Sequence, residues 1–186
     1  VRARVHELEQ VRTWERNPQM YADILSLSLA GQVLIQYAPA TATVYKRPLL
    51  MVPPCINKFY IMDLTPASSL VKFAVDQGHT VFMVSWRNVD AEGARFTWDD
   101  YLRLGVLDAI DAASDISRAD KINVLGFCVG GTLLAATLAY TAKTRDTRIA
   151  SATLFAAQVD FSHAGDLKVF IDEGQLAALD KHMQAV

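Results

Sequence analysis

The sequence has little cysteine: Cys55 and Cys128 are its only thiols. Two thiols are too few for a disulfide framework and favour a reducing compartment. The N-terminal stretch "VRARVHELEQ" has no apolar core, which predicts that no secretory signal peptide is present. The most apolar stretch, "VLGFCVGGTLLAATLAY", is interrupted by three glycines and is no candidate for a membrane span. We therefore expect a soluble, cytoplasmic protein.

An excess of charge of one sign is also lacking. Lys and Arg number 18 against 20 Asp and Glu, for a net charge of −2, so no basic surface for nucleic acid is indicated. Histidine and cysteine show no metal-ligand spacing, and we expect neither a metal nor a cofactor. The chain does not begin with methionine, and it is interpreted as a fragment of a longer protein.

The sequence is rich in apolar residues, at 52% of the total, arranged in short runs. Unbroken apolar runs are typical of parallel strands covered on both faces. Helix-length segments separate the runs, and strand–helix alternation predicts an α/β fold with a mostly parallel sheet and flanking helices. The strands are expected at 48–54, 79–86, 121–127 and 149–161, and the helices at 64–77, 97–117 and 130–144.

The first part of the chain has a different pattern. Apolar residues recur at three-to-four spacing from Val1 to about Leu29, which predicts helix. Asn17 and Pro18 form a plausible start for a second helix. We expect a helical segment of uncertain origin at 1–31, followed by a partial catalytic domain at 32–186.

Cys128 lies in the turn "GFCVGG" between a predicted strand and a predicted helix. Gly126, Gly130 and Gly131 fit a nucleophile elbow with cysteine in place of serine, because a Cβ would clash in so tight a turn. Such a turn exposes the thiol at the carboxyl edge of the sheet and at a helix N-terminus, which favours thiolate. The N–H of Val129 would then face a developing oxyanion.

Other interpretations of this turn are weaker or remain open. A dinucleotide-binding fingerprint would need glycine in place of Cys128. A cysteine-phosphatase loop would need arginine six residues after the thiol, where the sequence has Leu134. A glycine-rich turn with a buried, inert cysteine remains an alternative.

Three motifs occur together in the sequence: "GFCVGG" after "NVL", "RPLLMVPPCINKFYIMDL" at 47–64 and "QGHTVFMVSWRN" at 77–88. In this order they resemble the polyhydroxyalkanoate synthases, from about residue 32 to about residue 173. The resemblance implies an α/β-hydrolase fold, incomplete on its C-terminal side, and an acyltransferase. "PPCINK" and "TWDDY" are similar to the class I enzymes, which polymerise short-chain units.

The resemblance also implies roles for particular residues. Cys128 matches the nucleophile, Val129 supplies one oxyanion N–H, and Ile56 in "PPCIN" is the candidate for the second. Cys55 is expected to line the pocket. The loop also contains a polar residue, Asn57, which like the nearby Asp63 is interpreted more readily as structural.

The implied substrates are a 3-hydroxyacyl-CoA and a growing polyester chain, with a polymer granule surface and a second copy of the chain as further partners. The catalytic Asp and His are expected beyond residue 186, after a lid that begins near 162–186. We therefore expect the chain alone to be inactive.

The histidines in the sequence are weak candidates for the base; they are His6, His79, His163 and His182. Two other functions remain open. One is a thioesterase or esterase that uses His163 or His182. The other is a non-catalytic granule-associated or dimerisation module.

Overall fold

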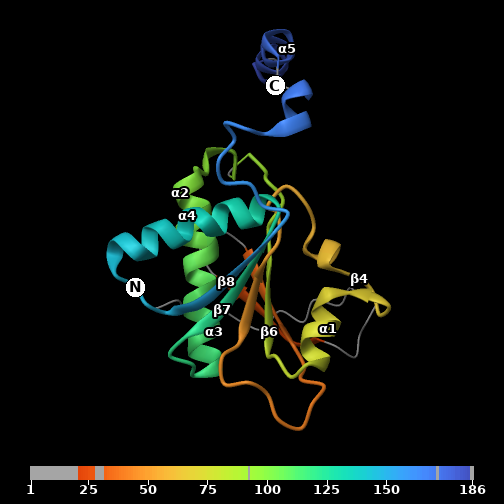
Figure 1. Ribbon diagram of the computed structural model, residues 1–186, viewed down its shortest axis with the longest axis vertical. Coiled ribbons are helices and arrows are strands. Elements are labelled where there is room, and N and C mark those ends of the chain that lie inside the picture. Colours follow the sequence, from red (N-terminus) through yellow and green to blue (C-terminus); the bar gives the residue numbers. More distant parts are fainter. Residues whose placement is uncertain (1–20, 28–31, 92, 171, 185–186) are drawn as a thin grey trace.

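The computed structural model describes residues 21–27, 32–91, 93–170 and 172–184. Its main sheet has six strands in the order β1-β2-β6-β3-β7-β8 (Figure 1). β2 pairs antiparallel with both β1 and β6, and the other neighbours pair in parallel. The strands are β1 Tyr21–Leu27, β2 Gln32–Tyr37, β3 Leu49–Val52, β6 Val81–Ser85, β7 Ile122–Phe127 and β8 Ile149–Phe155.

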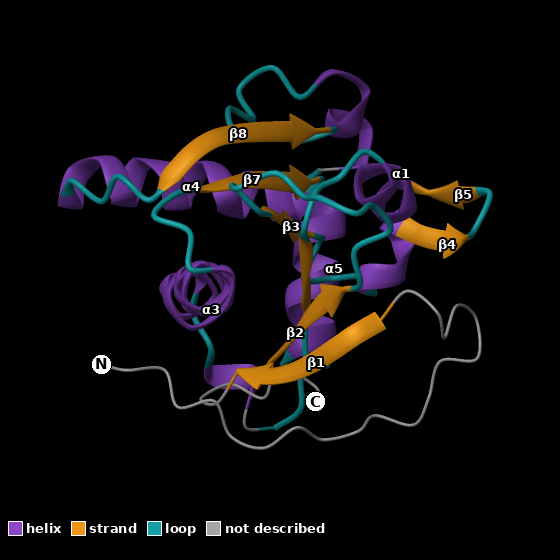
Figure 2. Cartoon of the chain, turned by 90° about the horizontal axis from the view of Figure 1, so that it is seen from below, coloured by secondary structure: helices purple, strands orange, loops and turns teal. Residues whose placement is uncertain are grey.

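Helices connect the parallel strands, as strand–helix alternation predicted. A small second sheet, β4–β5, comes between β3 and the first of these helices in the chain, and it lies beside that helix (Figure 2). The remaining elements are η1 Phe59–Met62, β4 Asp63–Thr65, β5 Ser68–Ser69, α1 Leu70–Asp76, η2 Gly93–Arg95, α2 Trp98–Asp100, the π-helix η3 Tyr101–Leu107, α3 Asp108–Ser117, α4 Val129–Thr144, η4 Gly165–Phe170 and α5 Glu173–Met183. None of the described helices combines the length and the apolar composition needed to cross a bilayer.

Alternate residues of the central strands enter two separate cores. On β3, Leu50 and Val52 pack with η3, α3 and α4, whereas Met51 packs with α1 and η1. On β6, Phe82 belongs to the first core and Met83 to the second. Because successive side chains of a strand point to opposite faces, these strands must be apolar throughout. This confirms the interpretation of the three central apolar runs.

The prediction of a helix over residues 18–29 is wrong for the residues that the structure describes. Tyr21–Leu27 is a strand, and it pairs with β2 from Leu27↔Gln32 to Tyr21↔Tyr37. A seven-residue stretch has little helix-forming tendency of its own, and ladder hydrogen bonds to a neighbouring strand outweigh it. β1 therefore joins the main sheet across the boundary expected at Gly31. The rest of the predicted helical pattern, at 1–20, lies outside the described residues.

β8 differs from the other parallel strands in its burial. It was expected to be covered on both faces, but Leu154 is 41% exposed and Phe155 is 43% exposed. Within the part of the chain that the structure describes, β8 pairs only with β7 and ends the sheet. From β8 the chain continues to α5, which projects away from the sheet and has only exposed side chains among those described (Figure 1).

Two predicted helix ends are confirmed by specific contacts, whereas the helix expected from residue 64 begins only at Leu70, after β4 and β5. Thr97 and Asp100 form a reciprocal capping box at the start of α2, which satisfies two N–H groups of the first turn. Gly78 follows α1 with a φ of 88°, a conformation that favours glycine.

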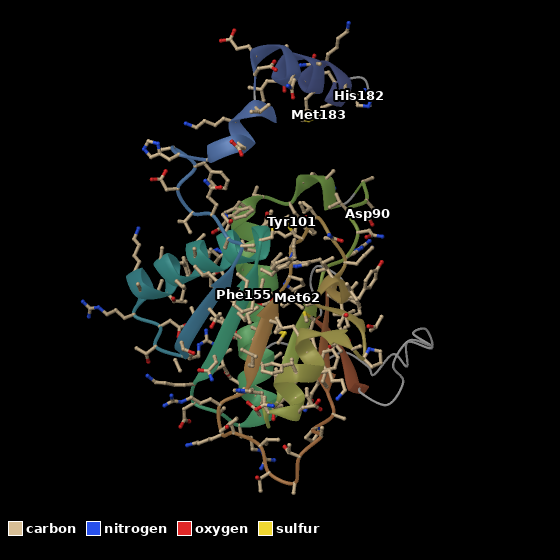
Figure 3. All side chains as sticks on the ribbon, turned by 45° about the vertical axis from the view of Figure 1, so that its right-hand side comes forward. Met62, Asp90, Tyr101, Phe155, His182 and Met183 are labelled. Atoms are coloured by element: carbon tan, nitrogen blue, oxygen red, sulfur yellow. The ribbon has the colours of Figure 1, made fainter. Side chains whose placement is uncertain are left out.

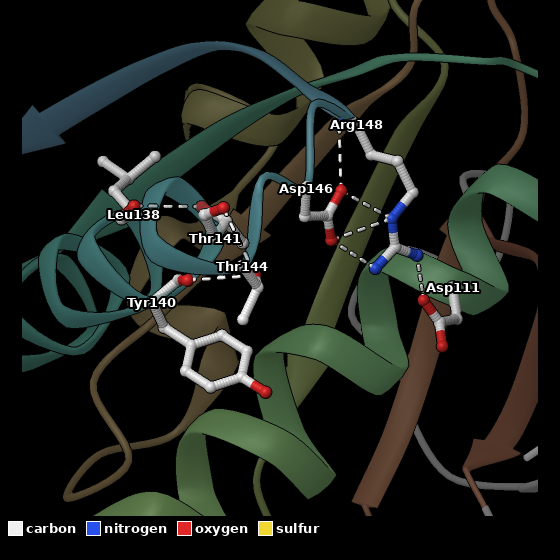
Figure 4. A network of polar contacts seen from close by, with 7 residues as sticks. All are labelled: Asp111, Leu138, Tyr140, Thr141, Thr144, Asp146 and Arg148. Carbon is white, nitrogen blue, oxygen red and sulfur yellow. Dashed lines mark hydrogen bonds and ion pairs between the residues drawn. The ribbon is translucent and has the colours of Figure 1, made fainter.

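A polar cluster joins α3 to the start of β8 (Figure 4). The guanidinium of Arg148 donates to both carboxylate oxygens of Asp146, with Nη2–Oδ2 at 2.7 Å, and also to Asp111 on α3. Hydrogen bonds from Arg148 hold the pKa of Asp146 below its ordinary value. The cluster fixes the loop that leads from α4 to β8.

We expect Arg148→Gln to lower the free energy of unfolding at pH 7 by about 1 kcal/mol, since the cluster is partly exposed. A carboxyl whose pKa is lowered by folding adds stability above its unfolded pKa of about 4 and loses it as the pH falls further. The difference between wild type and variant should therefore shrink below about pH 4. Urea denaturation over pH 3–7 measures it.

Lys46→Gln is the matched control, because Lys46 and Asp120 form an ion pair at 3.9 Å with both side chains more than 80% exposed. It should leave stability within about 0.3 kcal/mol of wild type. Equal losses in the two variants would contradict the role given to Arg148.

Candidate active site

Cys128 lies between the last residue of β7 and the first residue of α4. Its φ of 54° and ψ of −125° are strained for a residue with a side chain. The backbone N–H of Cys128 donates to the Phe155 carbonyl on β8 at 2.9 Å, and its carbonyl accepts from Gly131 and Thr132. Cys128 is half-buried as a residue. This is the sharp strand-to-helix turn that the sequence predicted.

The three glycines around Cys128 are required by close backbone approaches. A Cβ on Gly126 would lie 2.5 Å from the Cα of Gly131. A Cβ on Gly130 would lie 2.2 Å from the Val52 carbonyl oxygen. A Cβ on Gly131 would lie 2.4 Å from the Cβ of Ala157. The first turn of α4 therefore lies directly against the end of β3 on one side and against Ala157, which follows β8, on the other.

The "PPCIN" loop reaches the same edge of the sheet. Val52 ends β3 and pairs with Gly126 on β7, so the loop and the Cys128 turn follow adjacent parallel strands. Gly130 lies directly against the carbonyls of Val52 and Pro53. A hydrogen bond from Asn57 N–H to the Pro54 carbonyl, at 3.1 Å, closes the loop into a turn. The structure therefore brings the predicted nucleophile beside the loop that contains Ile56.

The two predicted oxyanion donors differ in their surroundings. Val129 is the first residue of α4, where a helix leaves its N–H groups without intrahelical acceptors. Ile56 has a side chain that is 78% exposed, and its N–H lies toward the thiol of its neighbour Cys55. The roles of both N–H groups stay predictions.

Cys55 is partly buried and packs against the core that contains Trp86. Burial raises the pKa of the Cys55 thiol, and the N–H groups of Cys55 and Ile56 oppose that rise. At neutral pH Cys55 is therefore held as the thiol, which makes it a poor nucleophile.

Asp63 has partners that give it a structural role. Its carboxylate accepts from the Ser69 hydroxyl at 2.6 Å and from the Tyr37 hydroxyl at 3.2 Å. Ser69 in turn caps α1 by accepting from Lys72 N–H. The side-chain oxygen of Asn57 accepts a hydrogen bond from the N–H of the next residue, Lys58, at 2.8 Å, so its contact is local to the loop.

The described histidines do not assemble with Cys128 into a hydrogen-bonded pair. His79 precedes β6 at the opposite edge of the sheet and stacks on Tyr45 with ring centroids 4.8 Å apart. His163 is exposed in the loop after β8, and His182 is exposed on the projecting α5 (Figure 3). His6 lies outside the described residues. Over the same part of the chain, no three His, Cys, Asp or Glu side chains are grouped to hold a metal ion.

Two aromatic residues at this edge were missed by sequence reasoning. Trp86 follows β6 and donates its indole N–H to the Pro53 carbonyl at 2.8 Å. Tyr101 opens η3 and lies against Trp86, with ring centroids 5.6 Å apart. Both line a small hollow with Val89 and Phe96. Apolar patterning alone could not distinguish them from ordinary core residues.

Two esterases are among the solved structures that this chain resembles in fold. The chain superposes on a fungal esterase from Rhizomucor miehei with a TM-score of 0.53 and 17% identity, covering 76% of this chain and 45% of the esterase. A putative esterase from Staphylococcus aureus gives 0.52 and 13%, covering 80% and 46%. At such identities the likeness establishes the fold alone, and the fold is that of the α/β-hydrolases.

Sequence comparison identifies the particular family. Residues 30–74 match the family model described as the poly-beta-hydroxybutyrate polymerase (PhaC) N-terminus. The poly(3-hydroxyalkanoate) polymerase subunit PhaC of Rhizobium etli is 57% identical over 152 residues, which cover 82% of this chain and 24% of that protein. The PhaC subunit of Cupriavidus necator is 57% identical over 143 residues, covering 77% and 24%.

These matches confirm the predicted resemblance: over the aligned residues, the chain is similar to poly(3-hydroxyalkanoate) polymerases. It spans about a quarter of the length of those curated relatives.

The contact between Gly131 and Ala157 gives a test of the elbow. We expect Gly131→Ala to lower the free energy of unfolding by about 1–3 kcal/mol, because its Cβ overlaps a side chain. Ala157→Gly in the same chain removes that atom and should restore part of the loss. Denaturant unfolding of the two single variants and the double variant measures the coupling.

Gly130→Ala is the contrasting variant, since its Cβ would meet the backbone oxygens of Val52 and Pro53. Ala157→Gly should not relieve it. Equal rescue of both glycine variants, or rescue of neither, would show that the close approaches are misplaced.

Proposed function

We propose that this chain carries the nucleophile-bearing part of a polyhydroxyalkanoate synthase and that Cys128 accepts the acyl group of a 3-hydroxyacyl-CoA. The observation that supports this most directly is the strained backbone of Cys128 in its glycine elbow. Backbone strain of this kind persists where surrounding structure enforces it, and it is common at active sites. The identity with poly(3-hydroxyalkanoate) polymerases supports the choice of substrate class.

In the proposed acyl transfer, the Cys128 sulfur attacks the thioester carbonyl carbon. A C–S bond to Cys128 forms, the C–S bond to coenzyme A breaks, and the thiol proton passes through solvent to the departing thiolate. One thioester replaces another, so the acyl-enzyme forms with little change in bond energy. The N–H of Val129, and that of Ile56 as the second donor, would stabilise the oxyanion of the intermediate.

Chain growth requires a further step. The 3-hydroxyl of a neighbouring acyl unit attacks the Cys128 thioester, forms an ester and releases the thiol. An alcohol is a weak nucleophile, so a general base must take its proton, and water must be kept out. In α/β-hydrolases the acid and the His follow the nucleophile in the chain. None of the described histidines is hydrogen-bonded to Cys128, and we propose that residues 1–186 alone do not polymerise.

The finer features of the function are part of the same proposal. "PPCINK" and "TWDDY" favour the class I, short-chain substrates. The polyester product implies work at a granule surface, and a second copy of the chain is a proposed partner. The proposed location is the cytoplasm.

The test is intact-protein mass spectrometry after incubation with 3-hydroxybutyryl-CoA. Wild type should gain one 3-hydroxybutyryl group, and Cys128→Ala should gain none. Cys55→Ala is the control for the other thiol, and it should still gain one 3-hydroxybutyryl group because Cys128 remains in place.

Coenzyme A release over time separates the alternatives. It should stop after about one equivalent per chain, as for an acyl-enzyme without a base. Sustained release that is lost in His163→Ala would favour a thioesterase. Acylation of Cys128→Ala would rule out Cys128 as the acceptor.

A further inference from the structure

Trp86 makes a buried hydrogen bond that has no role in the acyl transfer proposed above. Its side chain is 7% exposed, and the indole N–H donates to the Pro53 carbonyl across 33 positions of sequence. An indole has one donor and no acceptor, so this bond sets the orientation of the ring. The residue after Pro53 is also a proline and offers no N–H of its own.

The Pro53 carbonyl is held between two elements. The indole contacts it as a hydrogen-bond donor, and Gly130 in the first turn of α4 lies against it, with only 2.5 Å between the Pro53 oxygen and the place of an added Cβ. β3 ends at Val52, and Pro53 is the first residue of the loop that contains Ile56. The direction of this carbonyl therefore fixes how that loop leaves the strand next to Cys128.

Tyr101 also contacts the indole ring of Trp86. The two rings are tilted by 55° at 5.6 Å, and Tyr101 is the first residue of the π-helix η3. π-Helical turns are rare and frequently lie at functional sites. Tyr101 and Cys55, which belongs to the loop, both pack against the core that contains Trp86.

We infer that Trp86 is a positioning residue of the acyl-transfer site: its indole N–H, through the Pro53 carbonyl, holds the 54–57 loop in place against the N-terminal turn of α4. The inference rests on the proposed role of Cys128. Trp86 acts on the oxyanion side of the site and does not contact the reacting atoms.

The test uses Trp86→Phe in the full 186-residue chain, because phenylalanine keeps a buried ring and removes only the donor. Acylation of Cys128 by 3-hydroxybutyryl-CoA should slow by at least about 10-fold, since misplacement by about 1 Å costs on the order of 100-fold. Alkylation of Cys128 by iodoacetamide develops no oxyanion and should change less than about 2-fold. A purely structural defect would change both rates together.

Amide hydrogen exchange tests the loop without any acylation. Exchange at Cys55, Ile56 and Asn57 should speed up at least about 5-fold in Trp86→Phe, as expected when a local tether is lost. Trp98→Phe is the matched control, because Trp98 is 45% exposed on α2, and it should leave both rates and the exchange unchanged.

The outcomes separate the two proposals. If wild-type Cys128 takes no acyl group, the proposed function fails, and the exchange rates alone decide whether Trp86 holds the loop. If wild type is acylated and Trp86→Phe matches it in rate, the inference is overturned while the proposed function stands. Unchanged exchange at the 54–57 loop overturns the inference in either case.

Discussion

The close approach of the first turn of α4 to the ends of β3 and β8 is the constraint on which the candidate site depends. Gly126, Gly130 and Gly131 have no room for a Cβ, and backbone atoms occupy most of that space. With the helix pressed so near the sheet, the connection from β7 consists of Cys128 alone. That residue adopts a positive φ because no relaxed conformation spans so short a turn. The packing of α4 against the sheet therefore determines the position of the Cys128 thiol.

The two cores of the sheet explain why this turn is rigid. β3 and β6 contribute alternate side chains to both faces, so neither strand can shift without disturbing both cores. Pro53 and Trp86 lie directly after these strands and take their positions from them. A precise loop on a rigid scaffold is what preorganised oxyanion stabilisation requires. The lid expected near 162–186 is different, since the described side chains of α5 are all exposed.

The sequence predicted the features that depend on local chemistry. Apolar runs located β3, β6 and β7, Thr97 located the start of a helix, and the glycine spacing located the elbow. It failed where long-range contacts decide. Tyr21–Leu27 has a helical spacing but becomes a strand because β2 lies beside it. The bond from Trp86 to Pro53 joins residues that no local pattern connects. The sequence also did not predict the π-helical geometry of η3, whose Leu102 and Val106 pack into the first core.

The two borders of the main sheet are unequal. β1 has an irregular register between Tyr21 and Asp23, and such irregularities discourage further pairing. β8, from Ile149 to Phe155, has neither a charged residue nor a proline. In the portion of the chain described, no strand pairs along its outer side. Phe155 is the last residue of this border strand, and its carbonyl accepts from Cys128 N–H. The turn that carries Cys128 is therefore tied to the border of the described sheet as well as to its centre.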